Sequence, residues 1–251
     1  MADKTLVLIT GANQGLGYYA AQQMAATGKY HVLVGARDIM KADKAIQQLA
    51  EDSSVKVDAK DLEPLLIDAN SDESIDAAAK TVEKGYGRLD ILMVNHGIAV
   101  DQKAGNGKTL RQLYHEHYNT NVFGAAQIVE SFLPLLRKST ATGGKRIAFT
   151  SSGLSSLKYA EEDGIYSAEN YPLYRSTKTA LNMIMLGYAK MLDKEGFIVS
   201  ASDPGYCGTN LNDFNGMKDP RDGAKVLIRA AVASKEEVHG HVVDEEKQEP
   251  W

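Results

Sequence analysis

Short apolar runs that alternate with helix-like stretches constrain the fold of this chain more than any other feature. Each run is rich in residues that favour β-strands, which is typical of strands buried on both faces. The predicted strands cover residues 5–9, 31–34, 64–67, 90–94, 146–150 and 197–202. Strands that alternate with helices form parallel sheets with helices on both faces. We therefore expect a Rossmann-type, doubly wound α/β fold.

The stretches between the strands carry apolar residues at helical spacing, which predicts helices. These helices cover about residues 39–51, 72–84, 109–137 and 220–234, after a first helix that ends near Gly28. Gly85 and Gly87 are expected to end the helix at 72–84. Asn is a poor residue for a helix interior, so Asn121 predicts a kink or a water-binding role within 109–137.

The remaining segments are expected to form loops around one domain that covers residues 1–251. No linker or internal repeat divides the chain. We predict a surface loop at 101–108, a substrate-loop insertion at about 153–173 and a lid at about 206–218. The charged tail at 244–251 is expected to lie on the surface.

Composition limits the partners and the compartment. Of the 251 residues, 43% are apolar, which is enough for a sizeable core, and the formal net charge of -5 disfavours nucleic acid and anionic membranes as partners. No apolar run approaches the roughly 20 residues of a membrane span, and the first residues lead directly into a strand. We expect a soluble cytoplasmic protein with a small-molecule substrate.

Cysteine and histidine patterns predict neither a disulfide framework nor a metal site. Cys207 is the single cysteine and is interpreted as a small packing residue rather than a reactive thiol. His115 and His117 flank Glu116, but this spacing does not suit a metal ion.

A glycine-rich turn follows the first predicted strand, with the sequence TGANQGLG at residues 10–17. A strand, a glycine turn and a helix together set backbone N–H groups and a helix N-terminus against a phosphate. Gly11 permits the tight turn, Gly15 lets a pyrophosphate approach, and Gly17 lets the helix pack closely. The turn therefore predicts dinucleotide binding.

The ends of the second and third strands bear on the choice of cofactor. An Arg at the end of the second strand accommodates the 2′-phosphate of NADP, whereas an acidic residue binds the ribose hydroxyl of NAD. Arg37 favours NADP, and the adjacent Asp38 keeps NAD as the less favoured alternative. A surface pair between Arg37 and Asp38 is the structural alternative. Asp68 is a candidate to bind an adenine amino group, or else a helix N-terminal acid.

Tyr174 and Lys178 lie four residues apart in a predicted helix that begins near Pro172, so they share one helix face. A Lys ammonium beside a phenol lowers the tyrosine pKa from about 10. Tyr174 then becomes a candidate proton donor or acceptor near neutral pH. By itself this pair also fits an ordinary amphipathic helix.

Polar residues at the ends of the other strands favour the catalytic interpretation. They are Thr10, Arg37, Asp68, Asn95, Ser151, Ser152, Pro204 and Gly205. In open parallel sheets, ligands bind outside the carboxyl ends of the strands. The sequence therefore predicts a ligand site along this edge.

These motifs together resemble the short-chain dehydrogenase/reductase family. They occur in the family's order over about residues 5–243, as Thr10-Gly11…Gly15-Leu16-Gly17, Asn95-His96-Gly97, Asn121, Ser152, Tyr174…Lys178 and Pro204-Gly205…Thr209. The resemblance implies that Tyr174 is the general acid/base and that Ser152 positions the carbonyl. It implies that Lys178 lowers the pKa of Tyr174 and holds the ribose. Asn121 would anchor a proton-relay water.

The resemblance also implies the cofactor contacts. The candidate cofactor-binding residues are Gly11, Asn13, Gln14, Gly15, Leu16, Gly17, Arg37, Asp68, Asn95, Gly97, Tyr174, Lys178, Pro204, Gly205 and Thr209. The Arg37-Asp38 pair and the long interval between Ser152 and Tyr174 are similar to the NADP-dependent carbonyl-reductase branch. The closing Pro250-Trp251 is similar to fungal members. NADPH is the expected cofactor.

Two features depart from the family pattern. His96 stands where the family has a small Ala, and it either touches substrate or fills a gap. The interval between Ser152 and Tyr174 is longer than usual, and its extra residues are expected to form one wall of the substrate pocket. That insertion leaves the oligomeric state open between a monomer and a homo-oligomer.

The sequence thus predicts an NADP(H)-dependent oxidoreductase that reduces a ketone or aldehyde, or oxidises the alcohol. Aromatic residues in the variable walls favour an apolar or aromatic substrate, namely Tyr159, Tyr166, Tyr206 and Phe214. Two alternatives stay open. One is a non-catalytic NADP-binding redox sensor, and the other is the same fold acting as a dehydratase or epimerase.

Overall fold

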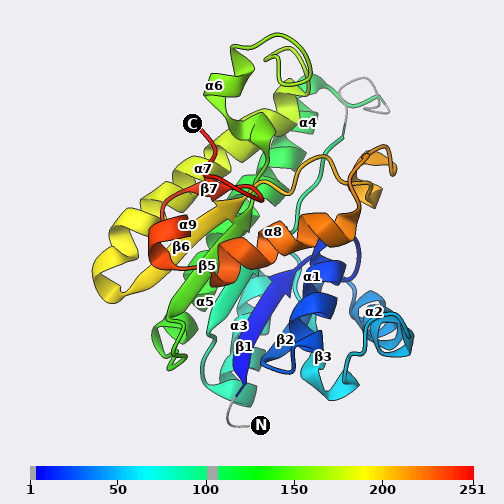
Figure 1. Ribbon diagram of the computed structural model, residues 1–251, viewed down its shortest axis with the longest axis vertical. Coiled ribbons are helices and arrows are strands. Elements are labelled where there is room, and N and C mark those ends of the chain that lie inside the picture. Colours follow the sequence, from blue (N-terminus) through cyan, green and yellow to red (C-terminus); the bar gives the residue numbers. More distant parts are fainter. Residues whose placement is uncertain (1–3, 101–106) are drawn as a thin grey trace.

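A computed structural model describes residues 4–100 and 107–251 and shows a seven-stranded sheet in the order β3-β2-β1-β4-β5-β6-β7 (Figure 1). Each neighbouring pair of strands runs parallel. The strands are β1 (Thr5–Thr10), β2 (Tyr30–Ala36), β3 (Leu62–Leu66), β4 (Ile91–Val94), β5 (Lys145–Thr150), β6 (Phe197–Ser202) and β7 (Val242–Val243). The predicted α/β fold is confirmed.

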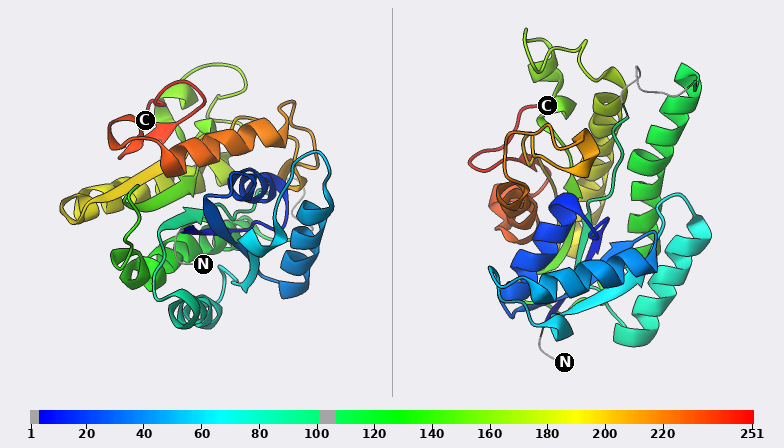
Figure 2. Two further views of the ribbon diagram at one scale, coloured as in Figure 1. Left: turned by 60° about the horizontal axis from the view of Figure 1, so that its bottom comes forward. Right: turned by 90° about the vertical axis from the view of Figure 1, so that its right-hand side faces the viewer.

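Helices cover both faces of the sheet, as Figure 2 shows in two further views. One face carries α1 (Gly15–Ala26), α2 (Ile39–Glu51) and α8 (Pro220–Val232). The other face carries α3 (Asp72–Tyr86), α5 (Gly124–Arg137) and α7 (Pro172–Leu192). The α4 helix (Leu110–Tyr118) packs beside α7, and the short helices are α6 (Leu157–Ala160) and α9 (Lys235–Val238).

The β1 strand shows why a continuous apolar run predicts a strand that is buried on both faces. Successive side chains of a strand point to opposite faces of the sheet. Leu6 and Leu8 join the core under α3, α5 and α7, whereas Val7 and Ile9 join the core under α1, α2 and α8. Both faces of this strand are therefore covered.

The helical stretch predicted at 109–137 is irregular at Asn121. A π-helical turn, η3 (Asn119–Phe123), joins α4 to α5 and shifts the helical hydrogen-bond pattern by one residue. The predicted end of α3 is wrong at Gly85, which lies inside the helix. Gly87 caps α3 with a positive φ of 71°, a conformation that glycine adopts without a steric penalty.

The charged tail at 244–251 lies on the surface as predicted, and backbone hydrogen bonds hold it there. The Lys158 backbone N–H donates to the Trp251 carbonyl at 2.8 Å, and Glu249 N–H donates to the Val242 carbonyl at 2.8 Å. The tail therefore folds back against the insertion at 153–173, which contains η4 (Gly153–Ser155) and α6. Its charged composition carries no signal for this backbone pairing. Of the expected loop at 101–108, residues 101–106 lie outside the described residues.

Within the described residues, no helix is long and apolar enough to cross a membrane.

Gly124 is required where α5 begins against the loop after β3. A Cβ atom at this position would lie 2.2 Å from the Ala69 carbonyl oxygen. We expect Gly124→Ala to lower the free energy of unfolding by about 1–3 kcal/mol, because the neighbouring backbone must move. Gly187 within α7 is the matched control, since an added Cβ there meets no described atom within 4 Å.

Gly187→Ala should raise the free energy of unfolding by up to about 1 kcal/mol, because alanine has the higher helix propensity. Urea unfolding of both variants measures the two effects. Equal stability of the two variants would contradict the steric explanation.

Candidate active site

The glycine turn forms a cradle between β1 and α1. Gly11 and Gly15 have positive φ angles of 65° and 60°. At Gly17, an added Cβ would lie 2.5 Å from Asn95 Nδ2, so a larger residue would push the turn off the sheet. The side chain of the N-cap residue Gln14 makes no capping hydrogen bond among the described residues. The first N–H groups of α1 thus suit an anion such as a pyrophosphate.

Asn95 fastens this cradle to the neighbouring strands. Its Nδ2 donates to the Thr10 carbonyl at 2.9 Å, and its Oδ1 accepts from Thr150 Oγ1 at 3.3 Å. The side chain therefore joins the ends of β1, β4 and β5. Gly97 lies close to Asn121 and Lys178, because an added Cβ would lie 3.4 Å from Asn121 Oδ1 and 3.6 Å from Lys178 Nζ.

His96 fills a gap and is held at both ring nitrogens. Nδ1 lies 2.8 Å from Thr10 Oγ1, and Nε2 lies 3.1 Å from the Thr120 carbonyl. A carbonyl only accepts, so Nε2 carries the hydrogen and Nδ1 accepts from the threonine hydroxyl. Burial, with a contribution from the Lys178 charge, lowers the pKa of His96 to about 4, and the ring is neutral at physiological pH. Both nitrogens already have protein partners, which favours the structural interpretation.

Asn121 links the π-helical turn to α7. Its Nδ2 donates to the Ile98 carbonyl at 2.9 Å and to Thr177 Oγ1 at 3.0 Å, and its Oδ1 accepts from Ile98 N–H at 2.8 Å. Asn121 is 1% exposed, so these bonds replace water that it would otherwise bind. The role expected for Asn121 in a proton relay remains a prediction.

Tyr174 and Lys178 lie on one face of α7, as expected from their spacing. Pro172 occupies the first turn of the helix. The Lys178 ammonium lies 5.6 Å from the centre of the Tyr174 ring and donates to the Thr150 carbonyl at 2.7 Å. The end of β5 therefore holds the ammonium that faces the phenol.

The expected lowering of the Tyr174 pKa is not found in the protein alone. Burial raises the pKa of Tyr174, and the negative charge of Asp203 adds to this effect. Burial also lowers the pKa of Lys178 to about 8. The Tyr-x-x-x-Lys spacing predicts the attraction between the two groups but not the desolvation of each. Desolvation has the larger effect on both pKa values here.

The two adjacent serines have different environments. Ser151 is buried and donates to Asn182 Oδ1 at 2.6 Å, so its hydroxyl is used inside the protein. Ser152 is half-buried, and its Oγ accepts from Leu154 N–H at 3.2 Å. That contact leaves the Ser152 hydroxyl hydrogen available to a ligand. The choice of Ser152 over Ser151 as the candidate is consistent with this difference.

The residues expected to contact the far end of the cofactor follow β2 and β3. Arg37 is exposed, while Asp38 caps α2 by accepting from Met40 N–H at 3.0 Å. Asp68 accepts from Asn70 N–H at 3.0 Å in the turn after β3. Thr209 lies beside the glycine cradle, because a Cβ added at Gly15 would lie 3.7 Å from the Cβ of Thr209.

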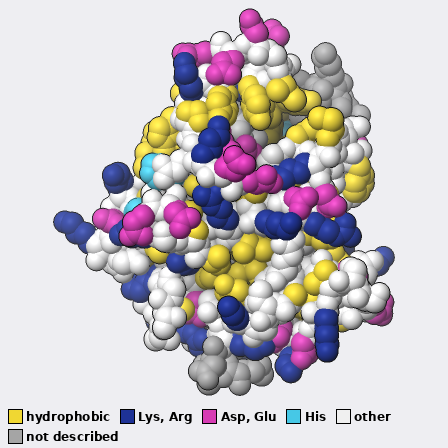
Figure 3. Space-filling model, viewed as in Figure 1, with side chains coloured by type: hydrophobic (Ala, Val, Ile, Leu, Met, Phe, Trp, Pro, Cys, Tyr) yellow, Lys and Arg dark blue, Asp and Glu magenta, His cyan; other side chains and the backbone are white. Residues whose placement is uncertain are grey.

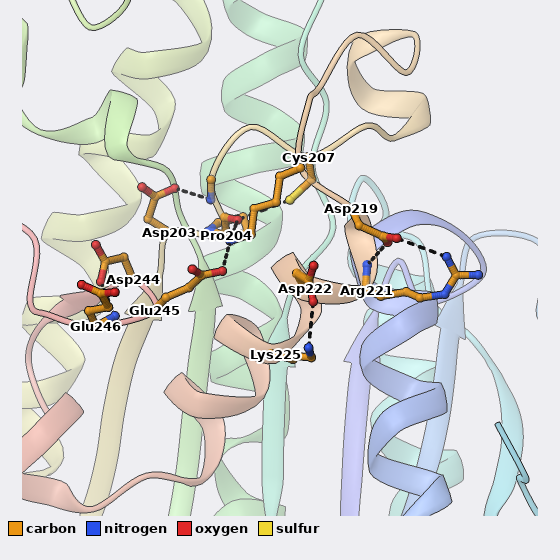
Figure 4. A network of polar contacts seen from close by, with 12 residues as sticks. Asp203, Pro204, Cys207, Asp219, Arg221, Asp222, Lys225, Asp244, Glu245 and Glu246 are labelled. Atoms are coloured by element: carbon orange, nitrogen blue, oxygen red, sulfur yellow. Dashed lines mark hydrogen bonds and ion pairs between the residues drawn. The ribbon is translucent and has the colours of Figure 1, made fainter. Parts of the chain in front are cut away.

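The base of the expected lid is held by a charged network (Figure 4). Lys218 Nζ donates to the Pro204 carbonyl at 2.7 Å and pairs with Glu245 Oε1 at 2.6 Å. The Asp203 carboxylate accepts from Gly205 N–H at 3.0 Å. Cys207 is buried, and burial raises the pKa of its thiol to about 11, which agrees with a packing role.

Sequence reasoning missed three polar residues that support the site: Arg175, Asn182 and Lys218. Asn182 lies four residues after Lys178, so its place on the same helix face was a signal that the sequence offered. Arg175 and Lys218 bind backbone carbonyls distant in sequence, for which the chain shows no local pattern. Among the described residues, no group of His, Cys, Asp and Glu could hold a metal ion.

Comparison with known proteins identifies the family. The family model described as short chain dehydrogenase matches residues 5–219. The chain belongs to the short-chain dehydrogenase/reductase family. It is 44% identical over 247 residues to the short-chain dehydrogenase anuI of Penicillium roqueforti, covering 97% of this chain and 95% of that one.

Carbonyl reductases are among the more distant relatives of this short-chain dehydrogenase/reductase. The mouse protein "Carbonyl reductase [NADPH] 1" is 25% identical over 285 residues, with 100% of this chain and 99% of that one covered. The structure of an NADPH-bound carbonyl reductase from chicken fatty liver superposes with a TM-score of 0.80 at 23% identity, covering 99% of each chain. The sequence resemblance to a fungal, carbonyl-reductase-like member of the family is confirmed.

The buried Lys178 ammonium makes the stability of the cofactor-free protein depend on pH. Its pKa falls from 10.5 to about 8 on folding, so between these values the unfolded chain binds more protons. The cost of burying the charge is therefore fully present below the lower value and disappears as pH rises through the window.

We expect the free energy of unfolding of the wild type to rise relative to that of Lys178→Met by about 2 kcal/mol between about pH 7 and about pH 9.5. Urea unfolding of both proteins at the two pH values measures this change. A constant difference would show that Lys178 does not titrate as a buried ammonium.

Proposed function

We propose that this protein is an NADPH-dependent reductase of ketones or aldehydes. The observation that carries the proposal is the arrangement of Ser152, Tyr174 and Lys178 at the edge of the sheet that also holds the glycine cradle. A hydroxyl, a phenol and an ammonium beside a dinucleotide cradle are the groups that a carbonyl reduction requires.

Each side chain has a separate part in the proposed reaction. When bound, the nicotinamide supplies the hydride that adds to the carbonyl carbon. The Ser152 and Tyr174 hydroxyls donate to the carbonyl oxygen and stabilise its developing negative charge. Tyr174 then transfers its proton to that oxygen, and Lys178 holds the ribose.

The raised pKa of Tyr174 agrees with its proposed role as a proton donor. Burial keeps the phenol protonated at neutral pH, and the proton donor of a reduction must start in that form. Alcohol oxidation would require the phenolate, which burial disfavours.

Arg37 and Asp38 support NADPH over NADH. The Asp38 carboxylate caps α2. This contact occupies the acidic group that would otherwise bind a ribose hydroxyl. Arg37 is exposed at the end of β2, where its guanidinium can pair with a 2′-phosphate.

The walls of the site support an apolar or aromatic substrate. Figure 3 shows hydrophobic side chains gathered below the charged tip of the molecule. Large apolar side chains are exposed on the insertion and on the lid, including Leu157, Ile165, Tyr166, Phe214 and Met217. We propose that the lid segment 206–218 closes over the substrate and excludes water.

Tyr174→Phe tests the chemistry. We expect kcat with NADPH and an aromatic aldehyde to fall by about 10²–10⁴-fold, because the proton donor is lost. The dissociation constant for NADPH, measured by calorimetry, should change by less than about twofold. Tyr188→Phe is the control, since Tyr188 lies on the same helix and bonds to Glu130 instead.

A variant Tyr174→Phe that keeps its activity would refute the proposed proton donor. A wild type that binds NADPH but consumes none with any carbonyl would support the redox sensor instead. Conversion without net consumption of NADPH would support a dehydratase or epimerase.

Arg37→Asp tests the cofactor preference. We expect it to weaken NADPH binding by about tenfold or more and NADH binding far less, since only NADPH carries the 2′-phosphate. Lys44→Asp makes the same change in charge on the exposed side of α2 and serves as the control. Equal weakening of both cofactors by Arg37→Asp would contradict the role of Arg37.

A further inference from the structure

Arg175 follows Tyr174 in the chain and is buried, with 7% of its surface exposed. Its guanidinium donates to three backbone carbonyls of the insertion: Nε to Leu154 at 3.1 Å, Nη1 to Ser167 at 2.6 Å and Nη2 to Tyr166 at 2.7 Å. Burial lowers its pKa. The Ser167 carbonyl also accepts from Asn170 N–H at 2.9 Å. A buried cation whose donors bind backbone carbonyls holds the backbone in place, because displacing it would leave buried polar groups without partners.

One of the three carbonyls comes from the start of the insertion and the other two come from its second half. Leu154 lies two residues after Ser152, and its N–H donates to Ser152 Oγ at 3.2 Å. A continuous chain of contacts therefore runs from Arg175 to the Leu154 carbonyl, and from the Leu154 N–H to the Ser152 hydroxyl. Since Arg175 is fixed in the helix next to Tyr174, this chain sets the position of one hydroxyl relative to the other.

The insertion also carries an aromatic wall. The rings of Tyr159 and Tyr166 lie 5.3 Å apart, and a Cβ at Gly153 would lie 3.1 Å from the Tyr166 ring. Arg175 binds the carbonyls of Tyr166 and Ser167, so it determines how closely this wall approaches Ser152.

We propose that Arg175 is a positioning and specificity-determining residue. It fixes the Ser152 hydroxyl relative to Tyr174 and holds the aromatic wall of the insertion beside the substrate. This inference rests on the proposed function, because its consequence is a preference for bulky aromatic carbonyls over small aliphatic ones.

Arg146 offers a matched control for the structural cost of losing a buried arginine. It is also 7% exposed, burial lowers its pKa, and it binds backbone carbonyls of Gly143, Ala231 and Ala233. Arg146 lies near the start of β5, at the opposite end of the strand from Ser152. A purely structural role would make the two arginines equivalent.

The experiment compares Arg175→Met, Arg175→Lys and Arg146→Met with the wild type. Turnover is followed by NADPH consumption with 2-naphthaldehyde and with propanal, and NADPH binding is measured by calorimetry. We expect Arg175→Met to lower kcat/KM for 2-naphthaldehyde by about tenfold or more, because small displacements of reacting groups are costly. The loss for propanal should be smaller, and NADPH affinity should stay within about twofold.

Arg175→Lys should keep more activity than Arg175→Met, because lysine retains a positive charge and N–H donors. It should keep less than the wild type, because an ammonium lacks the planar fork of the guanidinium. Arg146→Met should lose stability but keep the ratio of kcat/KM for the two aldehydes. Equal losses of kcat/KM in Arg175→Met and Arg146→Met, or an unchanged ratio in Arg175→Met, would overturn the proposal.

Hydrogen exchange of the backbone amides at 154–167 separates this inference from the proposed function. We expect Arg175→Met and, to a lesser extent, Arg175→Lys to speed exchange there, while Arg146→Met leaves it unchanged. A wild type without carbonyl turnover would refute the reductase, and exchange would still decide whether Arg175 holds the insertion. Unchanged exchange in both Arg175 variants would refute that role. Should Arg175→Met fail to fold, Arg175→Lys carries both readouts.

Discussion

The hydrogen bond from the buried Lys178 ammonium to the Thr150 carbonyl joins α7 to the sheet. It brings α7 against the end of β5, next to Ser151 and Ser152, and leaves the ammonium facing the Tyr174 ring. The same burial that allows this contact lowers the pKa of Lys178 and raises that of Tyr174, since both charged forms lose water. Geometry and acid–base behaviour thus have one physical origin.

Around this contact, α7 acts as the common support of the site. Thr177 accepts from Asn121 in the π-helical turn, and Asn182 accepts from Ser151 and donates to Ser155. Buried amides and hydroxyls that satisfy one another add rigidity, because any displacement would leave polar groups without partners. A helix bonded to both the π-helical turn and the serine loop can hold a hydroxyl and a phenol at fixed separation, which a site that transfers a proton requires.

The accuracy of the sequence predictions depends on the range of the interactions involved. The bounds of α2 at Ile39–Glu51 agree with the predicted range, because apolar spacing and the Asp38 cap are local. The end of α3 was misplaced at Gly85, since helix packing outweighs the modest cost of one glycine. The tail lies on the surface as predicted, but its pairing with the insertion was not predicted, because this pairing joins Trp251 to Lys158, far apart in the chain.

The sequence by itself determined the strand and helix order, the glycine cradle and the face shared by Tyr174 and Lys178. These features follow from periodicity and from backbone conformations that only near neighbours constrain. Only the tertiary structure decided that Ser151 is used internally, that His96 is held at both nitrogens and that Arg175 binds the insertion. It also decided the direction of the Tyr174 pKa shift, because desolvation depends on every atom packed around the group rather than on its neighbours in sequence.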